Sequence, residues 1–379
     1  MIVGAGTAAP VPETIPSMDV LLSDLRARVL LANAGGKALY IHGGGSKSFY
    51  GMPVDHESVL DMSPYAGVID YQPSELVLTA RAGTPLTQVE ALLAEQGQML
   101  AFEPPHFGGG ATLGGCVATA LAGPRRIAAG GVRDFVLGVR MLDAQGRVLR
   151  FGGTVMKNVA GYDVTRLITG SLGTLGVILE VSLKVMPKPA AETTLRFSVG
   201  EEEALRQMNA WGRQSLPVSA TAWDTDADGR GRLTVRLSGA GAAVAAAMKK
   251  MGGDVVPEAQ AAAWWRSLRD HTHPFLSRRP LWRLSVKSTA PALGLGATLI
   301  EWGGAQRWLA GPVAADAVRA AATRAGGHAT LFRASSAQEV RAVGVFHPLP
   351  PAIAAIHRRL KNEFDPEGVF NPGRMYPDL

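Results

Sequence analysis

The sequence predicts an α+β protein with two domains, and three observations lead to this prediction. Before residue 190, short apolar runs typical of strands alternate with glycine-rich loops. Between residues 193 and 335, strand-like runs alternate with alanine-rich helices, which is typical of an α+β domain with an antiparallel sheet. Pro187-Lys188-Pro189 separates the two regions and is the best candidate for a boundary. We therefore expect domains at residues 1–190 and 191–350, followed by a C-terminal segment at 351–379.

The composition narrows the classes of protein to consider. The 379 residues are 47% hydrophobic and 18% charged, which is ordinary for a soluble globular protein. A single cysteine, Cys116, excludes an intrachain disulfide framework and fits a reducing compartment. No apolar stretch reaches the roughly 18 residues that span a bilayer, and the first residues lack the features of a signal peptide. Nothing in the sequence resembles a nucleic-acid-binding module. We expect a cytoplasmic protein that binds no nucleic acid.

The first half is expected to hold two helices and several short strands. Residues 17–37 have apolar side chains near helical spacing, and Thr84-Pro85 is expected to cap a helix that runs to about residue 96. Asp143 to Gly146 reads as a hairpin turn between two strands. The apolar runs predict strands at 38–41, 59–62, 67–71, 76–83, 135–142, 148–151 and 177–185.

The strand at 38–41 runs into the loop from His42 to Gly51, which contains Gly43, Gly44 and Gly45 in succession. Glycines let the backbone approach another group closely, and successive N–H groups in such a loop can form a concave anion site suited to a pyrophosphate. The loop matches neither a Walker A motif nor a Rossmann fingerprint. Taken alone, a triple glycine is more often a plain turn than a ligand site.

Two further glycine regions follow. The second runs from Phe102 to Thr119, with Pro104-Pro105 at its entry and five glycines along its path. We expect a helix to begin at the small residues from Ala118 to Ala122. A flat or phosphorylated group would lie over the start of this helix. The third glycine region lies at Gly173 and Gly176, where a long strand begins.

The second half is expected to be built from strands at 194–199, 233–237, 281–286, 297–302 and 329–332. Alanine-rich helices are expected at 201–214, 240–251 and 313–325, and a final helix at 350–364. The tryptophans Trp264, Trp265, Trp302 and Trp308 are interpreted as core of this half in preference to a surface for subunit contacts.

The three glycine regions and the Asn371-Pro372-Gly373 tail together resemble the vanillyl-alcohol oxidase, or PCMH-type, family of FAD-binding flavoproteins. This resemblance implies a PCMH-type FAD-binding domain with a smaller antiparallel cap, and a tail that returns from the cap to the flavin. It also implies that the first loop wraps the FAD pyrophosphate, that the second lines the ribityl chain and flavin, and that the third meets the adenine. The cofactor-binding residues implied are His42, Gly43, Gly44, Gly45, Ser46, Lys47, Gly51, Pro104, Gly110, Thr112, Gly114, Gly115, Thr119, Arg125, Lys157, Gly176, Val177, Ile178 and Asn371.

A narrower resemblance is to the FAD-binding subunits of glycolate oxidase complexes. It rests on Gly123 to Arg126, Val132 to Gly138, Met156 to Asp163 and the tail from Phe364 to Arg374. The resemblance implies a complex with a larger FAD-linked subunit and an iron–sulfur subunit, oxidation of glycolate to glyoxylate, and transfer of electrons to the quinone chain. It places the protein in the cytoplasm, in contact with the inner face of the membrane only through its partners.

Oxidation of a 2-hydroxy acid requires cations for the substrate carboxylate, and arginine offers bidentate geometry. Arg266, Arg283 and Lys287 are the substrate candidates, with structural salt bridges as the alternative for each. Arg125 and Lys157 are candidates for flavin contact, with surface or ion-pair roles as the alternative. No catalytic base is identified.

Larger relatives that oxidise 2-hydroxy acids carry a histidine-rich motif thought to hold a metal, which this sequence lacks. His271-Thr272-His273 is the nearest pairing, and two histidines at this spacing would share a face if they lay on a strand. Solvent-exposed or capping histidines are the preferred interpretation, so no metal is expected. Three functions remain open: the complex subunit, a stand-alone dehydrogenase for another 2-hydroxy acid or an alditol, and an assembly subunit with structural FAD.

The FAD is expected to be non-covalent. Some relatives attach their flavin to a histidine beside the first glycine loop or to a cysteine in the second region. No histidine follows Gly45, and Cys116 reads as a small buried thiol at a helix start. An iron–sulfur cluster is excluded because it needs several cysteine ligands.

Overall fold

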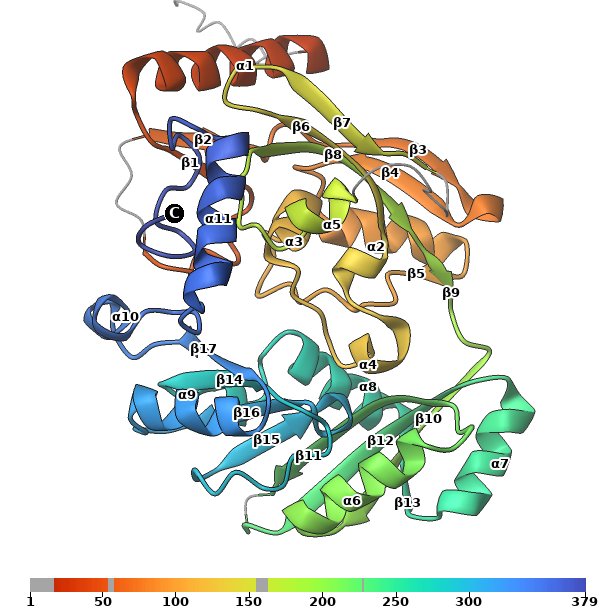
Figure 1. Cartoon of the computed structure of the whole chain (residues 1–379). Helices are drawn as coiled ribbons and strands as arrows, with labels where there is room; N and C mark the ends of the chain where they lie inside the picture. Colours follow the sequence, from red (N-terminus) through yellow and green to blue (C-terminus); the bar gives the residue numbers. More distant parts are fainter. Residues whose placement is uncertain (1–16, 54–57, 155–162, 227) are drawn as a thin grey trace, which may run out of the picture.

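The computed structural model describes residues 17–53, 58–154, 163–226 and 228–379 (Figure 1). It contains a five-stranded sheet of order β3-β4-β8-β6-β7 and an eight-stranded sheet of order β13-β10-β12-β11-β15-β16-β14-β17. In Figure 1 the first sheet lies in the upper half and the second in the lower half, and the chain passes between them after β9 (Met186–Pro187). Every neighbouring pair within both sheets is antiparallel, so the predicted α+β class is confirmed.

Helices cover both faces of the five-stranded sheet. Its strands are β3 (Val68–Gln72), β4 (Val77–Arg81), β6 (Val136–Leu142), β7 (Val148–Gly152) and β8 (Val177–Lys184). The central strand β8 is buried on both faces because α1 (Met18–Gly35) packs on one side and α2 (Leu86–Glu95), α3 (Leu113–Thr119) and α5 (Val164–Ile168) lie on the other. Val181 faces α2 and α3, whereas Leu179 faces α1.

A small parallel pair beside this sheet carries the first glycine loop. β1 (Leu39–His42) pairs with β2 (Ser58–Asp61), and Leu39 also forms a parallel bridge with Phe370 of the C-terminal tail. The tail arrives through α11 (Pro351–Phe364), whose buried Lys361 donates hydrogen bonds to the Thr174 and Phe370 carbonyls and to Asp365. The last segment of the chain therefore completes the first half of the molecule.

The eight-stranded sheet has one face toward the first half. Its strands are β10 (Ala191–Ser198), β11 (Val218–Thr225), β12 (Gly231–Gly239), β13 (Asp254–Val256), β14 (Leu281–Ser285), β15 (Thr298–Glu301), β16 (Gln306–Ala310) and β17 (His328–Arg333). α6 (Glu201–Gly212), α7 (Gly241–Met251) and α9 (Ala315–Arg324) cover the outer face. α8 (Glu258–Arg269) packs on the inner face together with Tyr50, Leu121 and Leu172 of the first half.

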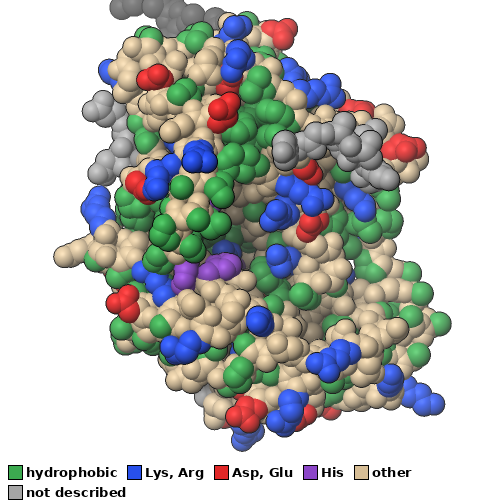
Figure 2. All heavy atoms as spheres, viewed as in Figure 1, with side chains coloured by type: hydrophobic (Ala, Val, Ile, Leu, Met, Phe, Trp, Pro, Cys, Tyr) green, Lys and Arg blue, Asp and Glu red, His purple; other side chains and the backbone are tan. Residues whose placement is uncertain are grey.

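One hydrophobic cluster therefore joins the two halves. The space-filling view shows that this side of the molecule is hollowed between the halves, with histidine and several Lys or Arg side chains at the rim (Figure 2). Trp265, Trp302 and Trp308 are buried and Trp264 is half-buried, so the interpretation of these side chains as core is confirmed.

No helix in the described part of the chain is long and apolar enough to cross a membrane.

Two local predictions were wrong, and one on the histidine pair is confirmed for His273. The helix expected to open at Ala118 instead ends there: Thr112 accepts a hydrogen bond from the Gly115 N–H at the start of α3, and Ala120 adopts a left-handed conformation that stops it. Thr84 does not cap α2, because its hydroxyl bonds Gly67. His273 caps a short 3-10 helix at Pro274–Ser277, so the interpretation as a capping histidine is confirmed for it. His271 lies in the turn after α8 and is left-handed.

Candidate functional site

The first and second glycine regions lie in direct backbone contact. A Cβ atom on Gly44 would fall 1.5 Å from the Gly110 carbonyl oxygen, and one on Gly43 would fall 2.6 Å from the Thr112 hydroxyl oxygen. Both distances are far below van der Waals contact, so only glycine fits at these two positions. The glycine-rich sequence is required by the approach of two loops, and a cavity opens beside their contact.

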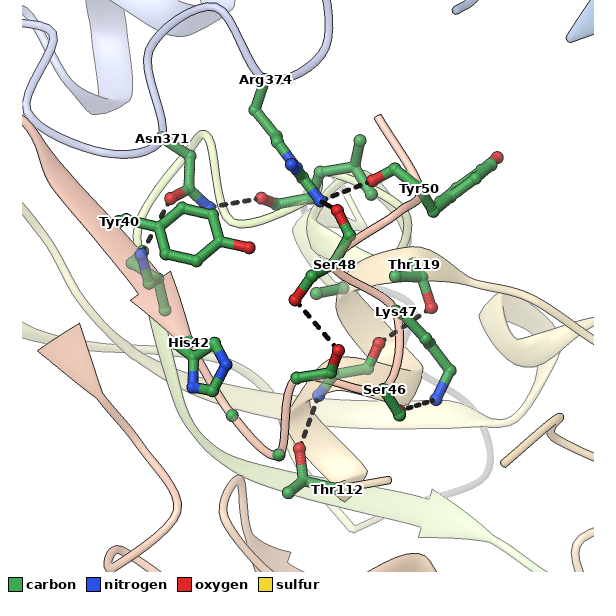
Figure 3. A pocket seen from close by; sticks show the side chains of 17 residues that line it. Tyr40, His42, Ser46, Lys47, Ser48, Tyr50, Thr112, Thr119, Asn371 and Arg374 are labelled. Carbon is green, nitrogen blue, oxygen red and sulfur yellow. Dashed lines mark hydrogen bonds between the residues drawn. The ribbon is translucent and has the colours of Figure 1, made fainter. Parts of the chain in front are cut away.

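This cavity runs between β1, the glycine loop, α3 and the C-terminal tail (Figure 3). One part of about 540 Å³ and a deeper part of about 420 Å³, both counting space open to solvent, share Ile41, Gly43, Thr112, Gly115, Ala118, Leu172 and Asn371 in their walls. The shared wall residues make the two parts one elongated site.

Backbone N–H groups line the loop side of the cavity. The five successive residues from Gly43 to Lys47 donate no backbone hydrogen bond to any described residue, whereas the next N–H, that of Ser48, bonds the Gly45 carbonyl. Gly44 and Gly45 are exposed and Gly43 and Ser46 are half-buried, so these free donors are open to solvent and to a ligand in the cavity. An anion with several oxygens, such as a pyrophosphate, has the chemistry to satisfy them.

Lys47 adds positive charge at the end of the loop. Its side chain is buried, and its ammonium group lies 3.2 Å from the Ser46 hydroxyl oxygen and 5.7 Å from the centre of the Phe107 ring. Burial lowers the pKa of Lys47. A partly desolvated cation at a cavity wall is well placed to stabilise negative charge on a ligand.

Asn371 and Arg374 of the C-terminal tail form hydrogen bonds with β1 and with the loop that follows it (Figure 3). Asn371 accepts a hydrogen bond from the Ile41 N–H at 2.8 Å and donates one to the Leu172 carbonyl at 2.7 Å. Arg374 donates to the carbonyls of Ser48, Tyr50 and Met52. The tail therefore acts as a clasp on β1 and on the loop that follows it.

Most of the predicted cofactor residues meet in this cavity. Its walls contain His42, Gly43, Gly44, Gly45, Ser46, Lys47, Thr112, Gly114, Gly115, Thr119, Gly176, Ile178 and Asn371. Gly51 lies behind the loop, where a Cβ would meet the Arg374 carbonyl at 2.9 Å, and Val177 packs in the core under α1. Pro104 and Gly110 do not line the cavity, although Gly110 shapes it through Gly44. Lys157 lies outside the described residues.

Arg125 is directed elsewhere. Its guanidinium lies 2.7 Å from Glu192 of β10 and 3.6 Å from Glu103, and its backbone N–H donates to Glu103. The structure therefore places it in an ion-pair network between the two halves instead of at the cavity, because two carboxylates already surround it. An ion-pair role was the alternative that the sequence left open for Arg125.

The three substrate candidates are not gathered together. Arg266 is exposed on α8, and Lys287 is exposed after β14. Arg283 alone reaches the junction, where it donates to the Tyr50 hydroxyl at 2.9 Å and lies 5.5 Å from the Phe332 ring centre. In the described part of the chain, no three His, Cys, Asp or Glu side chains are grouped as metal ligands.

Several cavity residues were not predicted. Tyr40, Ile41, Met62, Ala82, Leu172 and Arg374 also line it. Ser48, Tyr50, Ala118 and Gly173 line it too; they fall within the three predicted regions but were not named as site residues. Arg374 closes the tail motif that contains Asn371, so its position in that motif is a signal that points to it. The apolar wall residues carry no distinguishing local pattern.

Comparison with known proteins identifies the family. A family model described as an FAD binding domain matches residues 22–152. The glycolate oxidase subunit GlcE of Escherichia coli is 47% identical over 343 residues, which cover 90% of this chain and 93% of GlcE. The chain belongs to the GlcE family of glycolate oxidase subunits. It is an FAD-binding oxidoreductase homologue whose cofactor is FAD.

Members of other groups match the GlcE-family chain over shorter regions. D-2-hydroxyglutarate dehydrogenase of Xanthomonas citri is 30% identical over 54% of this chain and 43% of its own length. Glycolate oxidase subunit GlcD of Bacillus subtilis is 37% identical over 31% of this chain and 25% of its own length. A structure of p-cresol methylhydroxylase with substrate bound aligns with a TM-score of 0.67 at 15% identity, covering 94% of this chain and 88% of that one. This last likeness concerns the fold alone and supports the PCMH-type prediction.

Proposed function

We propose that this chain is the FAD-binding subunit of a glycolate oxidase complex that oxidises glycolate to glyoxylate. The observation that carries the proposal is identity of 47% with GlcE over nearly the whole of both chains. The free backbone donors of the glycine loop support it, because they suit the pyrophosphate of FAD. When bound, FAD supplies the acceptor for the hydride of a CH–OH group.

The residues that would hold FAD follow from the cavity. The N–H groups from Gly43 to Lys47 would bind the pyrophosphate, while Gly114, Gly115 and Thr119 of α3 would border the ribityl chain and flavin. Gly176 and Ile178 would meet the adenine end, and Asn371 would hold β1 in place beside it. The whole set lies in domain 1–190 and segment 351–379, with residues 191–350 forming the cap, which is the division we propose.

The FAD is proposed to be dissociable. Cys116 is fully buried, and burial raises the pKa of its thiol to about 12, which leaves the sulfur without nucleophilic character. It does not line the cavity. Denaturation in acid is expected to release all the flavin into the supernatant, and flavin retained on the precipitated chain would contradict this expectation.

We propose two partners, a larger FAD-linked subunit and an iron–sulfur subunit, through which electrons reach the quinone chain. One cysteine cannot ligate an iron–sulfur cluster, so such a cluster would need another chain. The protein would then be cytoplasmic and reach the inner face of the membrane through these partners alone.

The test is anaerobic reduction of the purified, FAD-loaded chain. Glycolate is added first to the chain alone and then to the chain with its two partner subunits, while the visible flavin bands are followed. Bleaching by glycolate in the complex, absent with the neutral analogue ethylene glycol, is the expected result. A complex whose flavin stays oxidised, or a chain that cannot be loaded with FAD, would refute the proposal.

An electron-relay or assembly role is the second candidate, and one observation favours it over a stand-alone dehydrogenase. The junction between the halves is filled by packed rings: Phe332 stacks on His271 at 5.0 Å and contacts Phe49 and Tyr50, each at 5.5 Å. Arg283 is the substrate candidate that reaches this junction. If glycolate bleaches the chain alone, the chain has its own substrate site. Bleaching only after partner subunits are added supports the relay or assembly role.

A further inference from the structure

A second cavity lies across the Ser48–Gly51 loop from the FAD cavity. It has about 670 Å³, counting space open to solvent, and is lined by that loop, by Arg279 and Arg333 of the second half, and by the start of α10 (Ala337–Val343). Ser48 borders both cavities, so only the loop separates this space from the FAD cavity. Two arginines thus face one space beside the cofactor site.

Arg333 is stacked on an aromatic floor. The central carbon of its guanidinium lies 3.7 Å from the centre of the Phe49 ring and 5.3 Å from that of Phe107. Its Nε is buried without a hydrogen-bond partner. A guanidinium that stacks flat on a ring keeps its edge donors free to bind a planar anion in a bidentate manner.

Arg279 is held in place by its own turn. Its Nη1 donates to the carbonyls of Ser277 and Arg278, each at 2.7 Å, and to that of Leu276 at 3.3 Å. Its Nε and Nη2 have no acceptor among the described residues. The side chain is exposed, so these donors face solvent at the mouth of the cavity.

No carboxylate balances the two guanidinium groups within the described chain: neither forms an ion pair there. The acidic side chain on α10, Glu339, instead accepts a hydrogen bond from the Ser335 N–H. Burial, and after it the positive charge of Arg279, lowers the pKa of Arg333 to about 10. Like charges that face one cavity, with no carboxylate of the described residues paired to them, favour an anion between them.

We propose that this cavity binds a small carboxylate anion, held by Arg279 and Arg333. The carboxylate class fits because its two oxygens match the edge donors of a guanidinium and because the floor is apolar. The site is separate from the FAD cavity and does not depend on the proposed glycolate oxidase function.

The test is calorimetric titration of the FAD-loaded full chain with oxalate, a carboxylate that has no CH–OH group to oxidise. Sulfate and neutral ethylene glycol are titrated in parallel. Arg279→Gln and Arg333→Gln are each expected to weaken oxalate binding by about tenfold or more, since each removes charge-assisted donors. The matched control is Arg278→Gln, because Arg278 is exposed, adjacent in sequence and outside the cavity.

Flavin content and thermal melting show whether each variant is folded. If Arg333→Gln does not fold, the exposed Arg279 still provides the test. Loss of oxalate affinity in these variants with an unchanged Arg278→Gln protein supports the proposal. It is overturned if both variants bind oxalate as the parent does, if sulfate binds more tightly than oxalate, or if oxalate gives no binding up to about 10 mM.

Discussion

The Asn371 side chain accepts a hydrogen bond from the Ile41 N–H at 2.8 Å, although the two residues are 330 positions apart. The same side chain donates to the Leu172 carbonyl, and the Asn371 N–H bonds the Leu39 carbonyl. Asn371 is itself left-handed, with φ of 43°, a conformation that asparagine tolerates better than most residues. One tail residue thus connects β1 with the third glycine region across the cofactor cavity.

Replacing Asn371 by alanine should weaken both the fold and FAD binding. The change leaves the Ile41 N–H and the Leu172 carbonyl without partners, which costs about 1–3 kcal/mol in free energy of unfolding. Urea unfolding and the flavin content of the purified chain measure the two effects. Asn371→Asp keeps the acceptor for Ile41 and should retain part of the stability. If the alanine variant matches the parent in both measurements, Asn371 does not act as a clasp.

The local sequence was sufficient to predict the glycine regions and the antiparallel sheet of the second half, because glycine runs and short apolar runs are short-range patterns. Long-range partners were not predictable in this way. Arg125 looks like a candidate for the flavin in sequence, yet it pairs with Glu192, which is 67 positions away. Its role depends on how the two halves dock, and no local pattern encodes that.

Missed elements have a similar physical explanation. β11 was not predicted because it is buried on both faces yet contains the buried polar residues Ser219 and Thr221, so its sequence shows no apolar run or clear alternation. Thr221 is satisfied by the Gly303 N–H and Ser219 by the Arg236 carbonyl, both distant in sequence. α8, β13 and β16 were missed as well.

Gly44→Ala should strongly weaken FAD binding. The new Cβ would lie 1.5 Å from the Gly110 carbonyl oxygen, so the two glycine loops must move apart and the row of free N–H donors is displaced. Titration of the apoprotein with FAD should show affinity reduced by about tenfold or more. Gly109→Ala is the control, because a Cβ there meets nothing within 4 Å. Equal FAD affinity in the two variants would mean that contact between the loops does not shape the site.

Glu103→Gln should destabilise the docking of the two halves at neutral pH. Burial tends to raise the pKa of Glu103, but Arg236 at 2.9 Å and Arg125 outweigh it, so the pKa is lowered overall. A lowered carboxyl pKa contributes stability above the unfolded value, about 4.3, and this contribution is lost as the pH falls through the folded value. We expect the variant to lose about 3 kcal/mol in free energy of unfolding at pH 7, and this deficit shrinks only as the pH falls below about 4.3 toward the lowered folded value. A deficit that stays constant over this range would contradict the ion-pair assignment.

Glu301→Gln should have the opposite effect and stabilise the protein at alkaline pH. Burial raises the pKa of Glu301 to about 7, despite hydrogen bonds from Trp308 and Gln306. The unfolded carboxyl loses its proton near pH 4.3 whereas the folded one keeps it, so stability falls as the pH rises from about 4.3 to about 7. A glutamine oxygen can accept the same two hydrogen bonds without this cost. Urea unfolding at pH 8 should therefore show the variant more stable by up to about 3 kcal/mol, with little difference at pH 4.5. The exposed Glu363→Gln serves as the control, and a variant that is less stable than the parent at both pH values would show that Glu301 is held as a buried charge instead.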